Sequence, residues 1–160
     1  MECFILKRCV QKQNKHRMEI ALMVTLKKNT LDLETYLSLR KAVGWKQLSE
    51  NQAKRALENC LYNVVAYVDD KPVAMGRVVG DGAVICYVQD LIVLPEYQGM
   101  KIGTKLIDNI KEFVTEIKEE DSEIMLCLMC AKGREKFYEG LGFIARPTGA
   151  LGPGMIQYIK

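Results

Sequence analysis

The residues best suited to chemistry lie between an apolar stretch and an amphipathic stretch in the middle of the chain. The segment Val88–Leu106 reads VQDLIVLPEYQGMKIGTKL, so a short glycine-containing loop follows a strand-like run and precedes a helical pattern. Backbone N–H groups and a helix N-terminus would then point at one place, and glycines would let an anion come close. The spacing predicts a site for a phosphate-bearing ligand. Its residues are Gln98, Gly99, Met100, Lys101, Ile102, Gly103 and Thr104.

This loop resembles the acetyl-CoA signature of the GNAT superfamily of N-acyltransferases, Gln/Arg-x-x-Gly-x-Gly/Ala. The segment QGMKIG matches the signature at Gln98 and Gly103, whereas Lys101 stands at the position of the first consensus glycine. A lysine at a helix start is unfavourable by about 0.3–1 kcal/mol unless an anion lies nearby. Lys101 and Lys105 are therefore either solvated surface residues or residues that face a phosphate.

A second segment, KFYEGLGF from Lys136 to Phe143, resembles the Phe-Tyr-x-x-x-Gly-Phe element of the same superfamily. The resemblance implies that Tyr138 lies beside the thioester sulfur and protonates the departing thiolate. The alternative is that Phe137 and Tyr138 pack a helix. The asparagine that often precedes this helix in the family is absent, and Cys130-Ala131-Lys132 occupies that region.

The strand before the loop contributes backbone and one carboxylate. In the family, the backbone at Leu91, Ile92 and Val93 pairs with the pantetheine arm near a bulge, and an N–H group there stabilises the oxyanion. Asp90 is the carboxylate embedded in this apolar strand, so it is the candidate general base. A structural hydrogen-bond acceptor is the alternative for Asp90, and a water chain would also serve as base.

Two residues are candidates for the amine acceptor. Trp45 follows the first helical pattern and could wall an acceptor pocket, as this loop often does in the family; core packing is the other reading. Arg77 would meet an acceptor carboxylate or be solvated.

Other chemistries find little support in the sequence. A P-loop motif and a G-x-G-x-x-G motif are absent, and the single histidine, His16, leaves no Ser-His-Asp arrangement. The pair Cys127 and Cys130 lies in an apolar run of strand length, where residues three apart point to opposite faces. We therefore expect packing rather than a zinc or redox site, and no metal.

Charge is concentrated at the N-terminus. Residues Met1–Arg17 carry five basic side chains against Glu2, a charge of +4, so the remaining residues sum to about −1 within the total of +3. This leader has no secretory-signal pattern, and it is expected to be disordered or non-native; a functional basic arm is the alternative. Residues 18–160 are expected to form one domain. No membrane span and no nucleic-acid face are predicted, which with free cysteines indicates a cytoplasmic protein.

The elements that must position these residues follow from periodicity, caps and turns. Strands are predicted at Ala21–Lys27, Tyr62–Val68, Lys71–Val79, Ala83–Val93, Glu123–Met129, Phe143–Arg146 and Met155–Ile159, and helices at Asp32–Val43, from Ser49 to about Asn59, at Gly103–Lys118 and near Gly133–Gly140. This order predicts an α/β (α+β) fold with a central mixed sheet and helices on both faces. It is similar to the GNAT-like acyl-CoA N-acyltransferase fold.

The resemblance implies an acetyl-CoA-dependent N-acetyltransferase in which a primary amine, on a small molecule or a peptide, attacks the thioester directly in a ternary complex. A non-catalytic acyl-CoA-binding or sensory module is one alternative. A nucleic-acid or ribosome-associated protein that acts through the basic leader is another. The resemblance leaves room for a homodimer, since dimers are common in the family.

Overall fold

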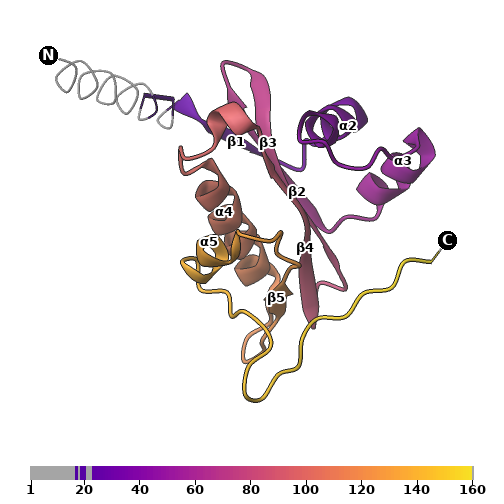
Figure 1. Ribbon diagram of the computed structural model, residues 1–160, viewed down its shortest axis with the longest axis vertical. Coiled ribbons are helices and arrows are strands. Elements are labelled where there is room, and N and C mark those ends of the chain that lie inside the picture. Colours follow the sequence, from indigo (N-terminus) through magenta and orange to yellow (C-terminus); the bar gives the residue numbers. More distant parts are fainter. Residues whose placement is uncertain (1–16, 18, 21–22, 160) are drawn as a thin grey trace, which may run out of the picture.

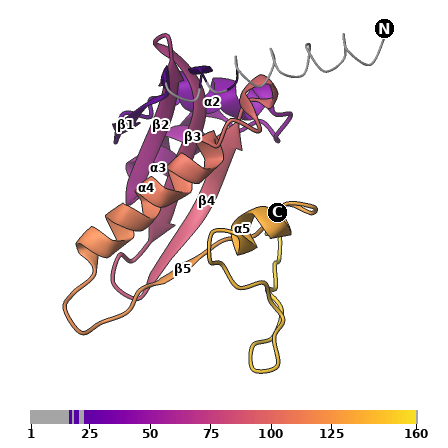
Figure 2. The same ribbon diagram turned by 90° about the vertical axis from the view of Figure 1, so that its left-hand side faces the viewer.

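A mixed five-stranded sheet with helices on both faces forms the body of the computed structural model (Figures 1 and 2). The structure describes residues 17, 19–20 and 23–159, so the predicted leader lies outside it except for Arg17. In sheet order the strands are β1 (Thr25–Lys28), β2 (Tyr62–Val68), β3 (Lys71–Gly80), β4 (Ile85–Val93) and β5 (Met125–Cys127). The first four strands pair antiparallel, and β5 pairs parallel to β4. The predicted fold class is confirmed.

Two of the helices begin where the sequence supplies a capping side chain. Asp32 accepts a hydrogen bond from the Thr35 N–H at 2.7 Å and begins α2 (Leu33–Ala42). Ser49 accepts from the Gln52 N–H at 3.2 Å and begins α3 (Glu50–Glu58). Both helices cover one face of the sheet, and α4 (Ile102–Ile117) covers the other (Figure 1).

The core lies between the sheet and the apolar stripe of α4. Leu106, Ile107 and Ile110 are fully buried there. A glycine in the middle of β3 lets α4 come close, since a Cβ atom at Gly76 would lie 2.9 Å from Ile110 Cδ1. This contact fixes the height of α4 above the sheet and thus the position of the loop that precedes it.

Several boundaries differ from the prediction. The first strand begins at Thr25 rather than Ala21, and residues 21–22 lie outside the described part. The strand predicted at Glu123–Met129 is only three residues long, and the helix α5 is Glu135–Glu139. The closing strands predicted at Phe143–Arg146 and Met155–Ile159 are wrong, because neither segment has a ladder partner in the structure.

The four cysteines in the described part of the chain are free thiols, with Cys86 buried, Cys60 and Cys127 half-buried and Cys130 exposed. Within the described part of the chain, no helix combines the length and the apolar character that crossing a bilayer requires.

Candidate functional site

The edge of β4 that faces β5 is paired over only part of its length. β5 pairs with Ile85, Cys86 and Tyr87, and the chain then leaves the sheet (Figure 2). The hydroxyl of Tyr87 accepts a hydrogen bond from the Met129 N–H at 3.1 Å, which holds the chain where it departs. Among the described residues, no strand pairs with the second half of β4 on the side that β5 has left, and this unpaired stretch is the free edge of β4.

A bulge in β4 sets which backbone groups face this edge. Arg77 is opposite Asp90 and Val78 is opposite Val88, so Gln89 is the extra residue. The Leu94 N–H donates to the Val73 carbonyl at 3.0 Å. Because backbone N–H groups alternate in direction along a strand, the N–H group of Ile92 also faces β3. The same alternation turns the N–H groups of Leu91 and Val93 toward the free edge. An extended ligand could add there as a strand does.

The loop between β4 and α4 has an unusual backbone. After the short 3-10 helix Pro95–Tyr97, Gly99 has a φ of +76°. Lys101 has φ 60° and ψ 13° and is the N-cap of α4, without a side-chain capping bond. The backbone is left-handed at the position where the family signature has its first glycine. Lys101 adopts this conformation with strain, because its Cβ atom crowds the backbone there.

Gly103 has a packing role as well as a place in the loop. A Cβ atom at Gly103 would lie 3.2 Å from Phe137 Cζ and 3.8 Å from Val93 Cγ2. The missing side chain thus lets α5 dock on the first turn of α4. This role was not predicted, because the contact joins residues far apart in the sequence.

Cationic side chains gather around the loop. Arg17 Nη1 lies 3.6 Å from the position of a Cβ atom on Gly99, so its guanidinium reaches the open face of that glycine. Arg134 Nη2 donates to Gln98 Oε1 at 3.3 Å, while Gln98 Nε2 donates to the Val93 carbonyl at 3.0 Å. No acidic residue occupies the first turn of α4. The sequence analysis missed Arg17 and Arg134, the first because it was assigned to the leader.

Tyr138 lies half-buried between two aromatic rings. Its ring is 4.9 Å from that of Phe137 and 5.8 Å from that of Phe143, both edge-to-face. Burial, with a smaller contribution from Cys130, raises the pKa of Tyr138 above its usual value, although Arg134 opposes the shift. The phenol therefore stays protonated at neutral pH, as a proton donor must.

Asp90 is the centre of a buried ionic cluster. Its side chain is 1% exposed, and it accepts hydrogen bonds from Arg77 Nε at 2.6 Å and from Arg40 Nη1 at 2.9 Å. The Tyr36 hydroxyl donates to the same carboxylate at 3.2 Å. Both carboxylate oxygens of Asp90 are thus engaged in hydrogen bonds. This arrangement favours a structural hydrogen-bond acceptor over a general base that is open to substrate.

Arg40 connects this cluster to the loop between α2 and α3. Its Nη2 donates to the Lys46 carbonyl at 3.3 Å, and its guanidinium lies 5.1 Å from the Trp45 ring centroid. Arg77 Nη1 donates to the Ala56 carbonyl of α3 at 3.0 Å. The structure therefore brings Trp45, Arg77 and Asp90 into one network. The sequence analysis missed the helix pair Tyr36 and Arg40, whose spacing of four residues was the available signal.

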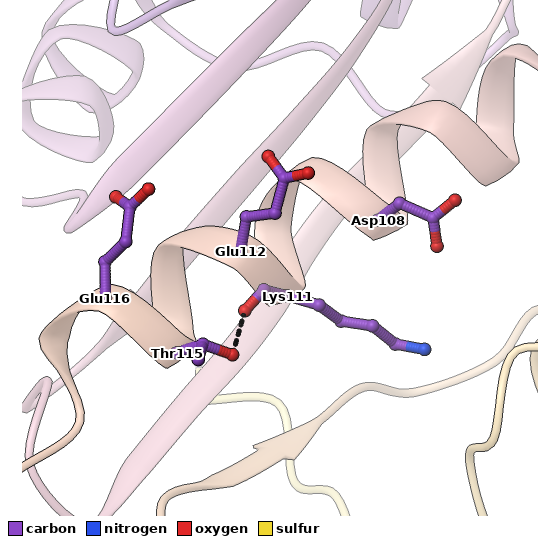
Figure 3. Close-up of a pocket in the computed structure, with 5 residues that line it drawn as sticks. All are labelled: Asp108, Lys111, Glu112, Thr115 and Glu116. Carbon is purple, nitrogen blue, oxygen red and sulfur yellow. Dashed lines mark hydrogen bonds between the residues drawn. The ribbon is translucent and has the colours of Figure 1, made fainter. Parts of the chain in front are cut away.

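Two shallow hollows lie away from the loop. One runs along the outer side of α4 and is shown in Figure 3. There Thr115 Oγ1 donates to the Lys111 carbonyl at 2.8 Å, and the Lys111 side chain extends away from Glu112 and Glu116. The other lies beside α3. Within residues 17, 19–20 and 23–159, no group of three or more His, Cys, Asp or Glu side chains is placed to hold a metal ion.

Comparison with known proteins gives a consistent result. A family model described as an acetyltransferase (GNAT) domain matches residues 59–145, which contain the β4 edge, the loop and Tyr138. A curated relative from Prochlorococcus marinus, named as an uncharacterized N-acetyltransferase ycf52-like, is 27% identical over 124 residues, which are 75% of this chain and 67% of the relative.

Two solved structures cover 86% of this chain and 99% of their own. A Staphylococcus aureus protein of unknown function, described as a probable acetyltransferase, is 30% identical with a TM-score of 0.73. An acetyltransferase of the GNAT family from Streptococcus pneumoniae is 32% identical with a TM-score of 0.70.

Proposed function

The chain belongs to the GNAT acetyltransferase family, and from this premise we propose that it moves the acetyl group of acetyl-CoA to a primary amine. The observation that carries the proposal is the free edge of β4, which runs directly into the loop and the N-terminus of α4. One extended ligand with phosphates at one end fits both features. Coenzyme A has this shape and charge distribution.

The loop binds the pyrophosphate in this proposal. The N–H groups from Gly99 to Thr104 and the dipole of α4 supply the backbone part of the site. Arg17, Lys101 and Arg134 add positive charge around it. The pantetheine arm then lies along Leu91 and Val93. A structural neighbour of the same fold, Arabidopsis thaliana Naa50 (21% identity, TM-score 0.62), was solved with the bisubstrate analogue CoA-Ac-MVNAL.

The chemistry proceeds by direct attack. The neutral amine adds to the thioester carbon, and an N–H group of the β4 edge stabilises the oxyanion that forms. The tetrahedral intermediate then collapses, the C–S bond breaks, and Tyr138 protonates the leaving thiolate. The proton that the amine loses passes to water, and solvent returns a proton to Tyr138. Asp90 enters as a positioning residue, because Arg40 and Arg77 already engage its oxygens.

The acceptor is a small-molecule or peptide amine that approaches on the side of α2 and α3. Trp45 lies in the loop between these helices, 37% exposed, and Arg40 ties that loop to the strand beside Leu91. Neighbours of the same fold differ in acceptor: one structure is an aminoglycoside acetyltransferase in complex with sisomicin (18% identity, TM-score 0.66). The fold is thus compatible with several amine classes.

The test compares binding with turnover. Calorimetric titration of the parent with acetyl-CoA should show binding, and a panel of amines should show release of the coenzyme A thiol. Tyr138→Phe should bind acetyl-CoA as the parent does but release thiol about 10²-fold more slowly or worse. Tyr158→Phe, at a tyrosine that is 81% exposed, is the matched control.

Absence of acetyl-CoA binding in the parent would contradict the proposal. Binding without thiol release for any amine would favour the non-catalytic acyl-CoA-binding alternative.

A further inference from the structure

The ionic cluster around Asp90 contains more positive than negative charge. Arg40 and Arg77 both donate to the Asp90 carboxylate, and their side chains are 12% and 6% exposed. The Tyr36 hydroxyl donates to the same carboxylate, and the centroid of its ring lies 5.4 Å from the Arg40 guanidinium and 5.5 Å from that of Arg77. Burial raises the pKa of Tyr36 above its usual value, so the phenol stays neutral and adds no negative charge. Two guanidinium groups against one carboxylate leave these four side chains with a net charge of +1.

Arg40 is the arginine of this cluster whose hydrogen bonds are incomplete. Its Nη1 donates to Asp90 and its Nη2 to the Lys46 carbonyl. Its Nε is buried and has no hydrogen-bond partner among the described residues. Buried polar groups are normally paired, so both the charge and the hydrogen bonding of the cluster leave room for one more anion. Arg40 is also the more exposed of the two arginines, and an anion from solvent therefore meets it first.

The loop that contacts Arg40 is basic and carries an aromatic ring. Residues 40–49 contain Arg40, Lys41 and Lys46 and no acidic residue, although the chain beyond the leader sums to about −1. Trp45 is 37% exposed, and the centroid of its ring lies 5.1 Å from the Arg40 guanidinium. This loop joins α2 to α3 on one face of the sheet (Figure 1), the side on which the acceptor is proposed to approach.

We propose that the acceptor of this chain is an amine that also carries a carboxylate, and that the carboxylate binds at Arg40 beside Trp45. A carboxylate supplies the negative charge that the cluster lacks, and guanidinium groups bind carboxylates through directed N–H bonds. The carbon chain of the acceptor packs on the exposed part of the Trp45 ring. A diamine brings a second positive charge to the same place, and the resulting repulsion selects against it.

The position of Arg40 also relates this anion site to the proposed thioester. Asp90, which Arg40 contacts at 2.9 Å, immediately precedes Leu91 on the free edge of β4. A carboxylate held by Arg40 is therefore anchored to the strand along which the pantetheine arm is proposed to lie. The inference rests on the proposed function, since it names the class of acceptor for the same site.

The test compares three amines of equal chain length that differ in charge at the far end: aminopentanoate, pentylamine and diaminopentane. Trp45 is the single tryptophan of the chain, so its fluorescence reports binding at this loop without any turnover. In the presence of coenzyme A, we expect aminopentanoate to change the fluorescence with a Kd about tenfold or more below that of the other two amines. Release of the coenzyme A thiol from acetyl-CoA should show the same order in kcat/KM.

A charge variant assigns the preference to Arg40. Arg40→Gln leaves Asp90 paired with Arg77 alone and should abolish the preference for aminopentanoate. Arg55→Gln, at an exposed position of α3, is the matched control and should keep it. The three amines are compared within each variant, so that altered packing would weaken all three together. Circular dichroism checks that both variants keep their fold.

The outcomes separate this inference from the proposed function. Equal binding of the three amines by the parent, tighter binding of pentylamine or diaminopentane, or no fluorescence change with any of them would overturn the inference, whereas thiol release with any amine would still support acetyl transfer. Preferential binding of aminopentanoate without thiol release would support the anion site and contradict acetyl transfer to this amine. A preference that survives Arg40→Gln would overturn the assignment to Arg40.

Discussion

Substitutions of Lys101 can separate the effect of backbone strain from the effect of charge in the loop that is proposed to bind coenzyme A. Its φ of 60° and ψ of 13° place it in the left-handed region, where a side chain is strained. Lys101→Gly removes both the strain and the ammonium group. Lys101→Ala removes the ammonium group but keeps a Cβ atom in the same conformation. The two variants therefore carry the same charge and differ in the strain of the folded chain and in the flexibility of the unfolded chain.

The size of the difference follows from opposing terms. A residue other than glycine costs about 1–2 kcal/mol in the left-handed conformation. Glycine in turn costs about 0.4–1 kcal/mol, because the unfolded chain becomes more flexible. The glycine variant should therefore have a free energy of unfolding about 0.5–1 kcal/mol above that of the alanine variant. For a chain of this size, each kcal/mol of difference in the free energy of unfolding changes Tm by about 2–4 °C.

Urea unfolding of the parent and both variants measures this difference, and titration with acetyl-CoA measures the charge. Loss of a cation beside a helix N-terminus that holds a phosphate should weaken binding by about 0.3–1 kcal/mol, or about two- to fivefold in Kd, equally in both variants. If the glycine variant is no more stable than the alanine variant, Lys101 is not strained and the reasoning fails. If Kd is unchanged in both, the ammonium group does not face a phosphate.

Three further predictions follow from the surroundings of the site. Asp90→Ala should lower the free energy of unfolding by about 3–5 kcal/mol in urea, because Arg40 and Arg77 lose the carboxylate they share; Asp108→Ala on α4 is the surface control, and an equal effect there would contradict the buried-pair argument. Arg17→Ala should raise the Kd for acetyl-CoA at low salt and less so at high salt, whereas Arg55→Ala on α3 should not. Burial raises the pKa of Tyr62 to about 12, so the unfolded chain ionises first and the free energy of unfolding should fall as pH rises from about 10 to about 12. Tyr62→Phe should reduce that fall in urea titrations at increasing pH, and the part that remains comes from Tyr36 and Tyr138, whose pKa values burial also raises. An unchanged profile would rule out Tyr62 as a source of the fall.

The sequence predicts the elements well wherever the signal is local. The side chains of Asp32 and Ser49 cap the helices that they were expected to begin. The strands expected at Tyr62–Val68 and Lys71–Val79 form a hairpin, and Asp69 and Asp70 between them have φ values of 49° and 59°, which suit a tight two-residue turn. These features depend on hydrogen bonds between residues only a few positions apart, and a single sequence contains that information.

Features that depend on distant residues could not be predicted in the same way. Asp90 receives its hydrogen bonds from residues 13, 50 and 54 positions away. An isolated carboxylate in an apolar strand fits a base and a structural acceptor equally well until these donors are known. The prediction of closing strands at Phe143–Arg146 and Met155–Ile159 was wrong for a related reason. The alternation of Met155–Ile159 is that of a strand, but a strand also needs a neighbour, and none of the described residues provides one.

Gly103 shows that one residue of a signature can have two roles. The sequence explains it by the approach of a phosphate to the backbone, whereas in the structure its missing side chain also admits the ring of Phe137. Phe137 precedes Tyr138, so the same glycine links the proposed phosphate loop to the proposed proton donor. A bulky residue at position 103 would displace α5 as well as hinder a phosphate, and loss of acetyl-CoA binding in such a variant would have two explanations. Lys101 makes no side-chain capping hydrogen bond at the start of α4, and a paired glycine and alanine substitution there leaves the contact between Gly103 and Phe137 in place.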